Sequence, residues 1–374
     1  MRVLHFFKTY FPDNCGGIER VINQISRGSI NHGIKTDVLC LTENKHNTVI
    51  ELDGHKIHRA KQNFHIASTG ISLSVFSLFS KLAKEADIIH YHFPWPMMDI
   101  VHFLTRHNKP TVLTYHSDII KQRQLLRLYR PLKNHFLSSV DSIVATSQNY
   151  LNSSNVLMRF KDKVEIIPIG LEKEAYPSIE ISRVNTWRPL VGSKFFLFIG
   201  VLRYYKGLHI LIEASRTAKY PIVIVGAGPI EQELKQKIDS YGLKNFIFLG
   251  FIPEEDKVAL LSLCYSIVFP SHLRSEAFGV SLLEGAMYGK PMISSEIGTG
   301  TSFININNET GLVIPPNDPH ALSQAMHWLW NHPVDAAAMG VKAEQRYWRL
   351  FTSDKMVNKY VDIYQRLTHK KNGT

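Results

Sequence analysis

The sequence is poor in cysteine and has no long apolar run. Its three cysteines, Cys15, Cys40 and Cys264, are too few and too scattered for a disulfide framework, and no C-x-x-C pair suggests a zinc ribbon. A reducing, cytoplasmic compartment suits such a chain. No apolar stretch approaches the roughly 20 residues of a membrane-spanning helix. We also expect no signal peptide, because the short apolar run at residues 3–7 is typical of a first strand.

The chain is basic, with a formal net charge of +11. Such an excess suits nucleic acid, an anionic membrane or a phosphorylated ligand. The excess is shared between the two halves and no nucleic-acid motif occurs, so a nucleic-acid-binding protein is the weaker interpretation. One segment, residues 119–139, contains five cations and no acidic residue: Lys121, Arg123, Arg127, Arg130 and Lys133. Its leucines and aromatic residues predict either a basic helix on an anionic membrane surface or an ordinary helix with a solvated basic face.

Short apolar runs alternate with longer amphipathic stretches along most of the chain. This rhythm is typical of βα units and predicts an α/β fold with doubly wound parallel sheets. The expected strands are Arg2–Phe7, Lys35–Cys40, Asp87–Tyr91, Thr111–Tyr115, Asp141–Ala145 and Val164–Ile167, then Phe195–Val201, Ile222–Val225, Phe246–Leu249, Ser266–Phe269 and Pro291–Ser294.

The rhythm breaks between Tyr176 and Gly192, where Pro177 and Pro189 interrupt the pattern. We therefore expect a first Rossmann-like domain at 1–176 and a linker at 177–192. A second such domain follows at 193–350, and a C-terminal helix at 351–374 returns to the first domain. In such a pair we expect the ligand in the cleft between the domains, beyond the carboxyl ends of the strands.

Several loops at these strand ends carry groups that suit an anionic ligand. Gly16 and Gly17 open a helix, where free amides and a bare backbone admit an anion, although a tight turn explains them equally well. Arg203 and Lys206 follow the first strand of the second half and could clamp a diphosphate, or be solvated loop cations. Gly226 and Gly228 follow the next strand and are a weak signal alone.

The most informative stretch runs from Ser275 to Gly285. Glu276 precedes a helix and Glu284 lies within it, while Phe278, Gly279, Val280 and Ser281 between them supply amides at the helix start. Carboxylates that accept hydrogen bonds from sugar hydroxyls therefore flank a place for phosphate. A sugar nucleotide presents these groups in that order.

Together these motifs resemble those of the retaining GT-B glycosyltransferases of family GT4, in the family's order and over almost the whole chain. The segments 248–250 and 310–316 fit as well. The resemblance implies that Glu276 contacts the donor sugar, Glu284 the ribose, and Arg203 with Lys206 the diphosphate. It implies that Gly16 and Gly17 approach the donor phosphates and that His116 lies near the donor sugar. Cys15, before the glycines, departs from the pattern.

The resemblance also implies retention of anomeric configuration. Since the sequence has no Asp-x-Asp motif to hold a divalent cation, we expect metal-independent chemistry without a cofactor. The motifs are similar to those of bacterial O-antigen and lipopolysaccharide mannosyltransferases. They suggest GDP-mannose as donor, an undecaprenyl-diphosphate-linked saccharide as acceptor, and a place at the inner face of the bacterial inner membrane.

Other interpretations stay open at this point. A UDP-sugar could replace the GDP-sugar as donor. A sugar-nucleotide epimerase or an inactive sugar-nucleotide-binding partner could have the same two-domain architecture. His90 and His92 stand two apart on one strand face, which suits a metal site or a cleft wall, but no third ligand is evident from the sequence.

Overall fold

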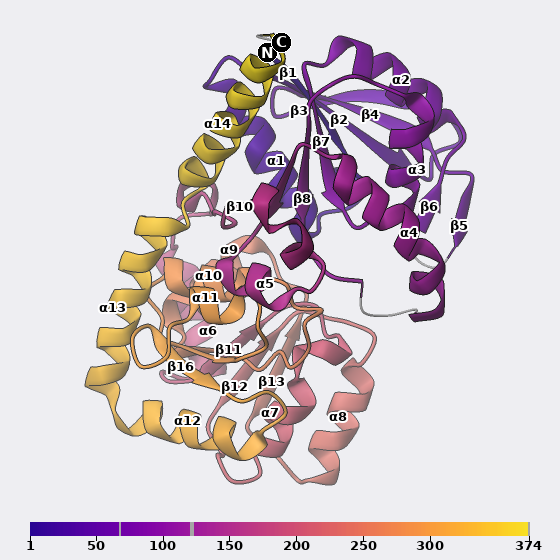
Figure 1. Ribbon diagram of the computed structural model, residues 1–374. Helices are drawn as coiled ribbons and strands as arrows, with labels where there is room; N and C mark the ends of the chain where they lie inside the picture. Colours follow the sequence, from indigo (N-terminus) through magenta and orange to yellow (C-terminus); the bar gives the residue numbers. More distant parts are fainter. Residues whose placement is uncertain (67–68, 120–122, 373–374) are drawn as a thin grey trace. The chain divides into compact units, whose positions relative to one another are not determined.

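The computed structural model describes residues 1–66, 69–119 and 123–372, and its contacts divide the chain into two compact units (Figure 1). Unit 1 comprises Met1–Gly170 and Ser353–Thr374, and unit 2 comprises Leu171–Thr352. The boundaries expected from the sequence are 176 and 351. Within the described part of the chain, no helix combines the length and apolar character that crossing a membrane requires.

Unit 1 is built on an eight-stranded sheet with the order β10-β9-β8-β7-β1-β2-β4-β3. All of its strands are parallel except β3, which pairs antiparallel with β4. Strands β5 and β6 pair antiparallel in a separate two-stranded sheet. The strands are β1 (Arg2–Phe6), β2 (Lys35–Thr42), β3 (Thr48–Leu52), β4 (His55–Lys61), β5 (Phe64–Ile66), β6 (Thr69–Ile71), β7 (Ile88–Phe93), β8 (Thr111–Tyr115), β9 (Ser142–Ala145) and β10 (Val164–Ile166).

Helices cover the two faces of this sheet. Helix α1 packs against α14 on one side, and α2, α3 and α4 pack in series on the other (Figure 1). The helices of unit 1 are α1 (Gly17–Ile30), α2 (Ser74–Glu85), α3 (Pro96–Thr105), α4 (Arg123–Ser139), α5 (Gln148–Ser153), the 3₁₀ turn η1 (Leu157–Lys163) and α14 (Ser353–Asn372). The apolar side chains of α14 recur at helical spacing, and Val357, Tyr360 and Tyr364 are buried.

Unit 2 contains a six-stranded, fully parallel sheet with the order β13-β12-β11-β14-β15-β16. Its strands are β11 (Phe196–Ile199), β12 (Ile222–Val225), β13 (Phe246–Gly250), β14 (Ser266–Phe269), β15 (Met292–Ser295) and β16 (Gly311–Ile314). Its helices are η2 (Lys173–Ala175), α6 (Ile181–Val191), η3 (Tyr204–Lys206), α7 (Leu208–Ala214), α8 (Glu231–Ser240), α9 (Glu254–Leu263), α10 (Val280–Met287), α11 (Thr301–Ile304), α12 (Pro319–Asn331) and α13 (Pro333–Leu350).

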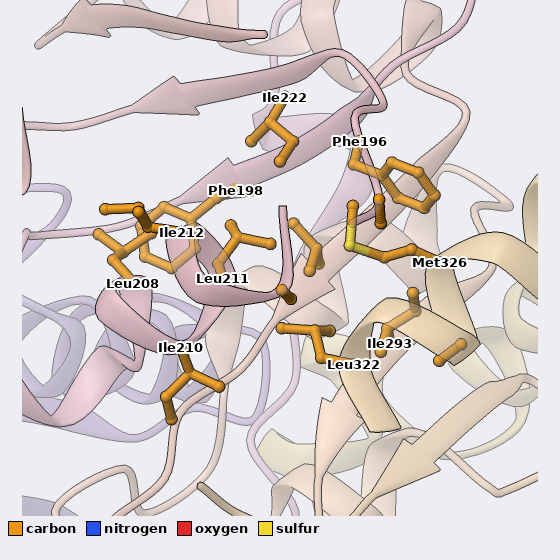
Figure 2. Packing of buried hydrophobic residues seen from close by; sticks show 14 of the residues in the cluster. Phe196, Phe198, Leu208, Ile210, Leu211, Ile212, Ile222, Ile293, Leu322 and Met326 are labelled. Atoms are coloured by element: carbon orange, nitrogen blue, oxygen red, sulfur yellow. The ribbon is translucent and has the colours of Figure 1, made fainter. Parts of the chain in front are cut away.

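The core of unit 2 lies between its sheet and helices α7 and α12. Figure 2 shows Leu208 and Leu211 of α7 near Phe198 of β11, and Leu322 and Met326 of α12 near the same sheet. These side chains are fully buried. Such burial stabilises the fold by about 1.5–3 kcal/mol per large apolar side chain and so anchors the strands whose carboxyl ends carry the loops of unit 2.

The segment expected to be an irregular linker contains helix α6. Its polar anchors are Arg183 Nη1 and Trp187 Nε1, which donate to Asp256 Oδ1 of α9 at 2.9 and 3.0 Å. These two residues lie four apart and so share one helix face. Because most other α6 side chains are exposed, the segment lacks the apolar stripe that would reveal a helix.

Candidate functional site

The candidate site of unit 2 lies where its strand order reverses. From β11 the chain proceeds outward through β12 and β13, then returns to place β14 on the other side of β11. The loops that follow β11 and β14 therefore run in opposite directions. The crevice between two such loops is the usual ligand site of a doubly wound sheet. Arg203 and Lys206 lie in the first loop, and Glu276 lies in the second.

Lys206 and Glu276 form an ion pair at this point. The Nζ atom of Lys206 donates to Oε2 of Glu276 at 2.5 Å, and the two side chains are only 12% and 11% exposed. The Lys206 ammonium also lies 4.7 Å from the centre of the Phe269 ring. Arg203 is exposed and, among the described residues, forms no ion pair. The loop thus offers one cation held by a carboxylate and a second that faces water.

Gly226 and Gly228 support this loop through close backbone packing. A Cβ atom at Gly226 would lie 2.1 Å from the Gly200 oxygen, and one at Gly228 would lie 2.4 Å from the Leu202 oxygen. The Leu202 amide donates to the Ala227 oxygen at 3.1 Å. These glycines therefore have a clear structural role in holding the loop that carries Arg203 and Lys206.

Glu284 is buried inside α10 and has two donors that the sequence did not reveal. Its Oε1 atom accepts from Lys257 Nζ at 2.6 Å and from Tyr176 Oη at 3.0 Å. Lys257 also pairs with Glu254 at 2.5 Å. Since both donors to Glu284 converge on one oxygen, the second oxygen is the one left for a ligand. Lys257 and Tyr176 come from distant segments, and no local pattern in the sequence predicts these contacts.

The start of α10 is shaped by Gly279, whose φ of 100° is strained for any other residue. Phe278 is buried before it, and the backbone of Val280 begins the helix. The hydroxyl of Ser281 donates to the Ile199 oxygen at 2.8 Å, which ties α10 to β11. The amides of this turn, rather than the Ser281 hydroxyl, are the groups suited to an anion.

Two further glycines near α10 have structural explanations that the sequence did not suggest. A Cβ atom at Gly285 would lie 2.5 Å from Cγ1 of Ile267, so this residue permits α10 to pack on β14. Gly289 lies beyond the C-terminal end of α10 and has a φ of 64°, a conformation that favours glycine. Neither glycine supports ligand binding.

In unit 1, the paired glycines lie at the N-terminus of α1, beyond the end of β1. A Cβ atom at Gly16 would lie 2.5 Å from Oε2 of Glu19, whose Oε1 accepts from the Thr9 hydroxyl. No heavy atom lies within 4 Å of a Cβ atom added at Gly17, whose backbone is helical. Packing in the described residues therefore does not require glycine at position 17.

His116 follows β8 and is 6% exposed. Its Nε2 atom lies 3.0 Å from Nδ1 of His92, and the second nitrogen of His92 lies 2.9 Å from Nδ1 of His5. Burial lowers the pKa of His116 to about 3. No third ligand beside His90 and His92 is evident from the sequence, but β1 places His5 next to them, with ring nitrogens of the three residues within 4.8 Å of one another. The sequence could not show this, since 85 residues separate His5 from His90.

The basic segment forms helix α4, although residues 120–122, with Lys121, lie outside the described residues. Phe136 and Leu137 are fully buried, and Lys133 is 6% exposed, so one of the five cations does not face water. The outer face carries Arg127 and Arg130 together with Leu125 and Leu128, which are 52% and 80% exposed. This face combines cations with exposed leucines.

Sequence comparisons place the whole chain among known proteins. Residues 15–175 match the family described as Glycosyltransferase Family 4, and residues 185–346 match the one described as Glycosyl transferases group 1. A D-rhamnosyltransferase, WbpZ of Pseudomonas aeruginosa, is 59% identical over 94% of this chain and 93% of its own length. The O-antigen chain mannosyltransferase C of Escherichia coli is 48% identical over 99% of this chain and 100% of its own length.

Structure comparisons agree on the fold. Sucrose-phosphate synthase of Thermosynechococcus elongatus aligns with a TM-score of 0.80 at 20% identity, over 99% of each chain. The Anabaena protein HepE, solved with UDP, aligns with a TM-score of 0.77 at 18% identity, over 98% of this chain and 100% of its own. At these identities the likeness concerns the fold alone. It confirms the GT-B architecture with two parallel-sheet α/β domains.

Proposed function

Because the chain belongs to glycosyltransferase family 4, we propose that it transfers a mannosyl residue from GDP-mannose, with retention of configuration and without a metal ion. The proposed acceptor is an undecaprenyl-diphosphate-linked saccharide in O-antigen synthesis. The observation that carries the proposal is the Lys206–Glu276 ion pair at the strand-order reversal of unit 2. The O-antigen mannosyltransferase of Escherichia coli supports the choice of sugar and pathway.

In this proposal the charge that develops on the leaving GDP is stabilised by Arg203, Lys206 and the amides of Val280 and Ser281. The bond from the anomeric carbon to the diphosphate oxygen breaks. A bond to the acceptor hydroxyl oxygen forms on the same face, and the hydroxyl proton passes to the departing diphosphate. No covalent intermediate with the enzyme is required.

The carboxylates bind hydroxyl groups of the donor. Glu276 exchanges part of its bond with Lys206 for a hydroxyl of the sugar, while Lys206 turns to the diphosphate. The free oxygen of Glu284 accepts from the ribose. From the family resemblance we also propose that Gly16 and Gly17 bind the donor phosphates and that His116 contacts the donor sugar.

The first experiment is a thermal-shift screen against GDP, UDP, ADP and TDP, with and without EDTA. Ligand at 100 times its Kd stabilises the folded protein by about 2.7 kcal/mol, which is readily visible. We expect a shift with GDP that EDTA does not change. A shift with UDP alone would exclude the GDP-sugar, and no shift with any nucleotide would favour an inactive or non-nucleotide protein.

Activity of variants then tests the roles. Lys206→Ala should lower kcat by about 100-fold or more, as expected for removal of a group that stabilises transition-state charge. Glu276→Gln should lower kcat by a similar factor of about 100, because a carboxylate beside the sugar also stabilises the positive charge that develops on it. Lys235→Ala is a matched control, because Lys235 pairs with Glu231 in unit 2 on the exposed face of α8. Wild-type transfer by Glu276→Gln, or strong inhibition by EDTA, would refute the assignment.

The relative at 59% identity favours a second donor, GDP-D-rhamnose. D-Rhamnose is mannose without its 6-hydroxyl, so the two donors differ by one hydrogen-bonding group. An enzyme built to bind that hydroxyl should reject the deoxy sugar strongly, whereas an apolar pocket discriminates by only about 10–200-fold. The ratio of kcat/KM for the two donors decides between mannosyl and D-rhamnosyl transfer.

We further propose that the outer face of α4 binds the anionic membrane surface that holds the lipid-linked acceptor. Arg127, Arg130 and Leu128 are exposed on this helix. Arg127→Glu/Arg130→Glu should weaken sedimentation with phosphatidylglycerol vesicles, by about 1 kcal/mol per cation removed. Equal binding by the double variant and the wild type would leave α4 as an ordinary surface helix.

A further inference from the structure

Four buried histidines lie together in the sheet of unit 1. His5 is on β1, His90 and His92 are on β7, and His116 follows β8. None is more than 6% exposed. The parallel register pairs His5 with His90, and the alternation of side chains along β7 puts His92 on the same face as His90.

A metal centre is one reading of this cluster, because nitrogens of His5, His90 and His92 lie within 4.8 Å of one another. The ring arrangement argues against it. His90 and His92 stack face to face, with centroids 4.3 Å apart and planes at 29°, whereas a metal ion is bound by lone pairs in the ring planes. Both nitrogens of His90 are also engaged, at 2.6 Å by the hydroxyl of Tyr364 and at 2.7 Å by that of Thr114.

The other three histidines form a hydrogen-bonded chain. Nδ1 of His5 lies 2.9 Å from Nε2 of His92, and Nδ1 of His92 lies 3.0 Å from Nε2 of His116. Adjacent rings in the chain are nearly parallel, at 19° and 22°. Both contacts thus have a normal hydrogen-bond distance, and the nearly parallel ring planes allow the N–H of one ring to point at the in-plane lone pair of the next.

The chain has a definite direction. Burial lowers the pKa of His5 and of His116 to about 3, and that of His92 well below its usual value, so each ring is neutral near pH 7 and carries one N–H. Nε2 of His5 is buried and has no partner in the part of the chain that the structure describes. A buried N–H without an acceptor is rarer than an unpaired acceptor, so the proton of His5 belongs on Nδ1. His5 then donates to His92, and His92 donates to Nε2 of His116.

We propose that His92 and His5 are positioning residues that hold His116 as a neutral imidazole with its proton on Nδ1. This inference rests on the proposed function, in which His116 approaches the donor sugar. With Nε2 committed to His92, His116 presents only a neutral N–H donor to a sugar oxygen. A neutral ring adds no charge beside the sugar as it becomes cationic, so it does not oppose the transition state.

The same chain excludes His116 as a general base. Nδ1 of His116 already carries the ring proton, and the lone pair of Nε2 accepts from His92. A further proton would have to break this hydrogen bond and create an imidazolium among buried rings. Among the described residues, the inner end of the chain at His5 Nε2 has no partner to which a proton could pass. Transfer of the acceptor proton must therefore follow another route.

The decisive test is the tautomer of His116 in the wild-type protein, measured by ¹⁵N NMR with ¹⁵N-labelled histidine at pH 7.5. The His116→Asn variant identifies the signal. We expect a protonated Nδ1 and an unprotonated Nε2. A proton on Nε2, or an imidazolium, would overturn the proposal. This measurement uses neither donor nor activity, so it stands apart from the tests at Lys206 and Glu276.

His92→Phe breaks the chain, and His90→Phe is its matched control in the same cluster. We expect His92→Phe to release the tautomer of His116 and to lower kcat by about 10-fold, the order expected for loss of one supporting hydrogen bond. His90→Phe should keep the tautomer and stay within about 3-fold of wild-type kcat. An unchanged tautomer in His92→Phe would refute the inference, as would stoichiometric Zn²⁺ binding that His90→Phe abolishes.

Discussion

Acidification should destabilise unit 1 more than unit 2, because unit 1 encloses neutral histidines. The pKa of His5 and that of His116 are lowered to about 3 by burial, and those of His90 and His92 are lowered well below the usual value. The unfolded chain binds a proton at each of these sites below about pH 6.5, and the folded unit does not. Stability is therefore present above pH 6.5 and is lost as the pH falls toward 3.

The magnitude follows from the two pKa values that are defined. With a pKa of about 3 in the folded state and about 6.5 in the unfolded state, lowering the pH from 8 to 5 costs about 2 kcal/mol for each of His5 and His116. His90 and His92 add to this loss. Asp99 opposes it, because burial raises its pKa well above the usual value. One carboxyl offsets at most about 4 kcal/mol over three pH units, so the histidines prevail.

The position of the tryptophans makes the assay specific for each unit. Trp95 is fully buried and is the one tryptophan of unit 1, whereas Trp187, Trp328, Trp330 and Trp348 belong to unit 2. Urea unfolding of protein labelled with 5-fluorotryptophan, followed by ¹⁹F NMR, therefore reports the two units separately. We expect the Trp95 midpoint to fall steeply between pH 8 and pH 5, and the unit 2 midpoints to change less.

The control removes the opposing carboxyl. Asp99→Asn can still accept from the Tyr129 hydroxyl, so it should make the pH dependence at Trp95 steeper. A Trp95 midpoint that stays constant or rises on acidification would contradict the reasoning. It would mean that these histidines are protonated in the folded protein.

Three further substitutions have defined outcomes. Lys257→Met should destabilise unit 2 by about 3–5 kcal/mol in urea unfolding, because it leaves the buried Glu284 without its cation. Adding Glu284→Gln to this variant should restore part of the lost stability. No recovery would show that the loss comes from packing and not from the unpaired charge. Gly207→Ala should displace the loop that carries Lys206, because φ of Gly207 is 73° and the new Cβ atom would lie 1.9 Å from the Pro270 oxygen. Isothermal titration calorimetry should then show weaker binding of GDP. Gly17→Ala should leave the unfolding midpoint unchanged but raise the donor KM, because the added methyl has open space in the described structure; an unchanged KM would remove Gly17 from the site.

Much of the fold was predictable because buried parallel strands read as apolar runs. The β3–β4 hairpin was missed although Asp53-Gly54, a strong turn signal, lies between its strands with φ of 49° and 77°. Helix α6 was missed because its few anchors are polar. Local sequence patterns therefore predict elements that bury an apolar stripe, but they do not predict elements held by a few hydrogen bonds.

The site was predictable to the extent that each group stands in a recognisable motif. The Lys206–Glu276 contact joins two such motifs, which the structure brings together. Lys257, Tyr176 and His5 stand in no motif, and they reach Glu284 or His92 only through tertiary contacts. Supporting residues of this kind cannot be predicted from one sequence, because the fold brings them together and no local sequence pattern marks them.

The last helix has a consequence for how the protein is made. Unit 2 interrupts unit 1 in the chain, and α14 supplies Tyr360 and Tyr364 to the hydrogen bonds of Thr114 and His90 and places Val357 against Gly28. On the ribosome, therefore, the first 170 residues emerge without the side chains that complete their core. All elements of unit 2 are made before α14, whereas unit 1 is complete only once α14 has been made. The N-terminal half is thus the last to mature.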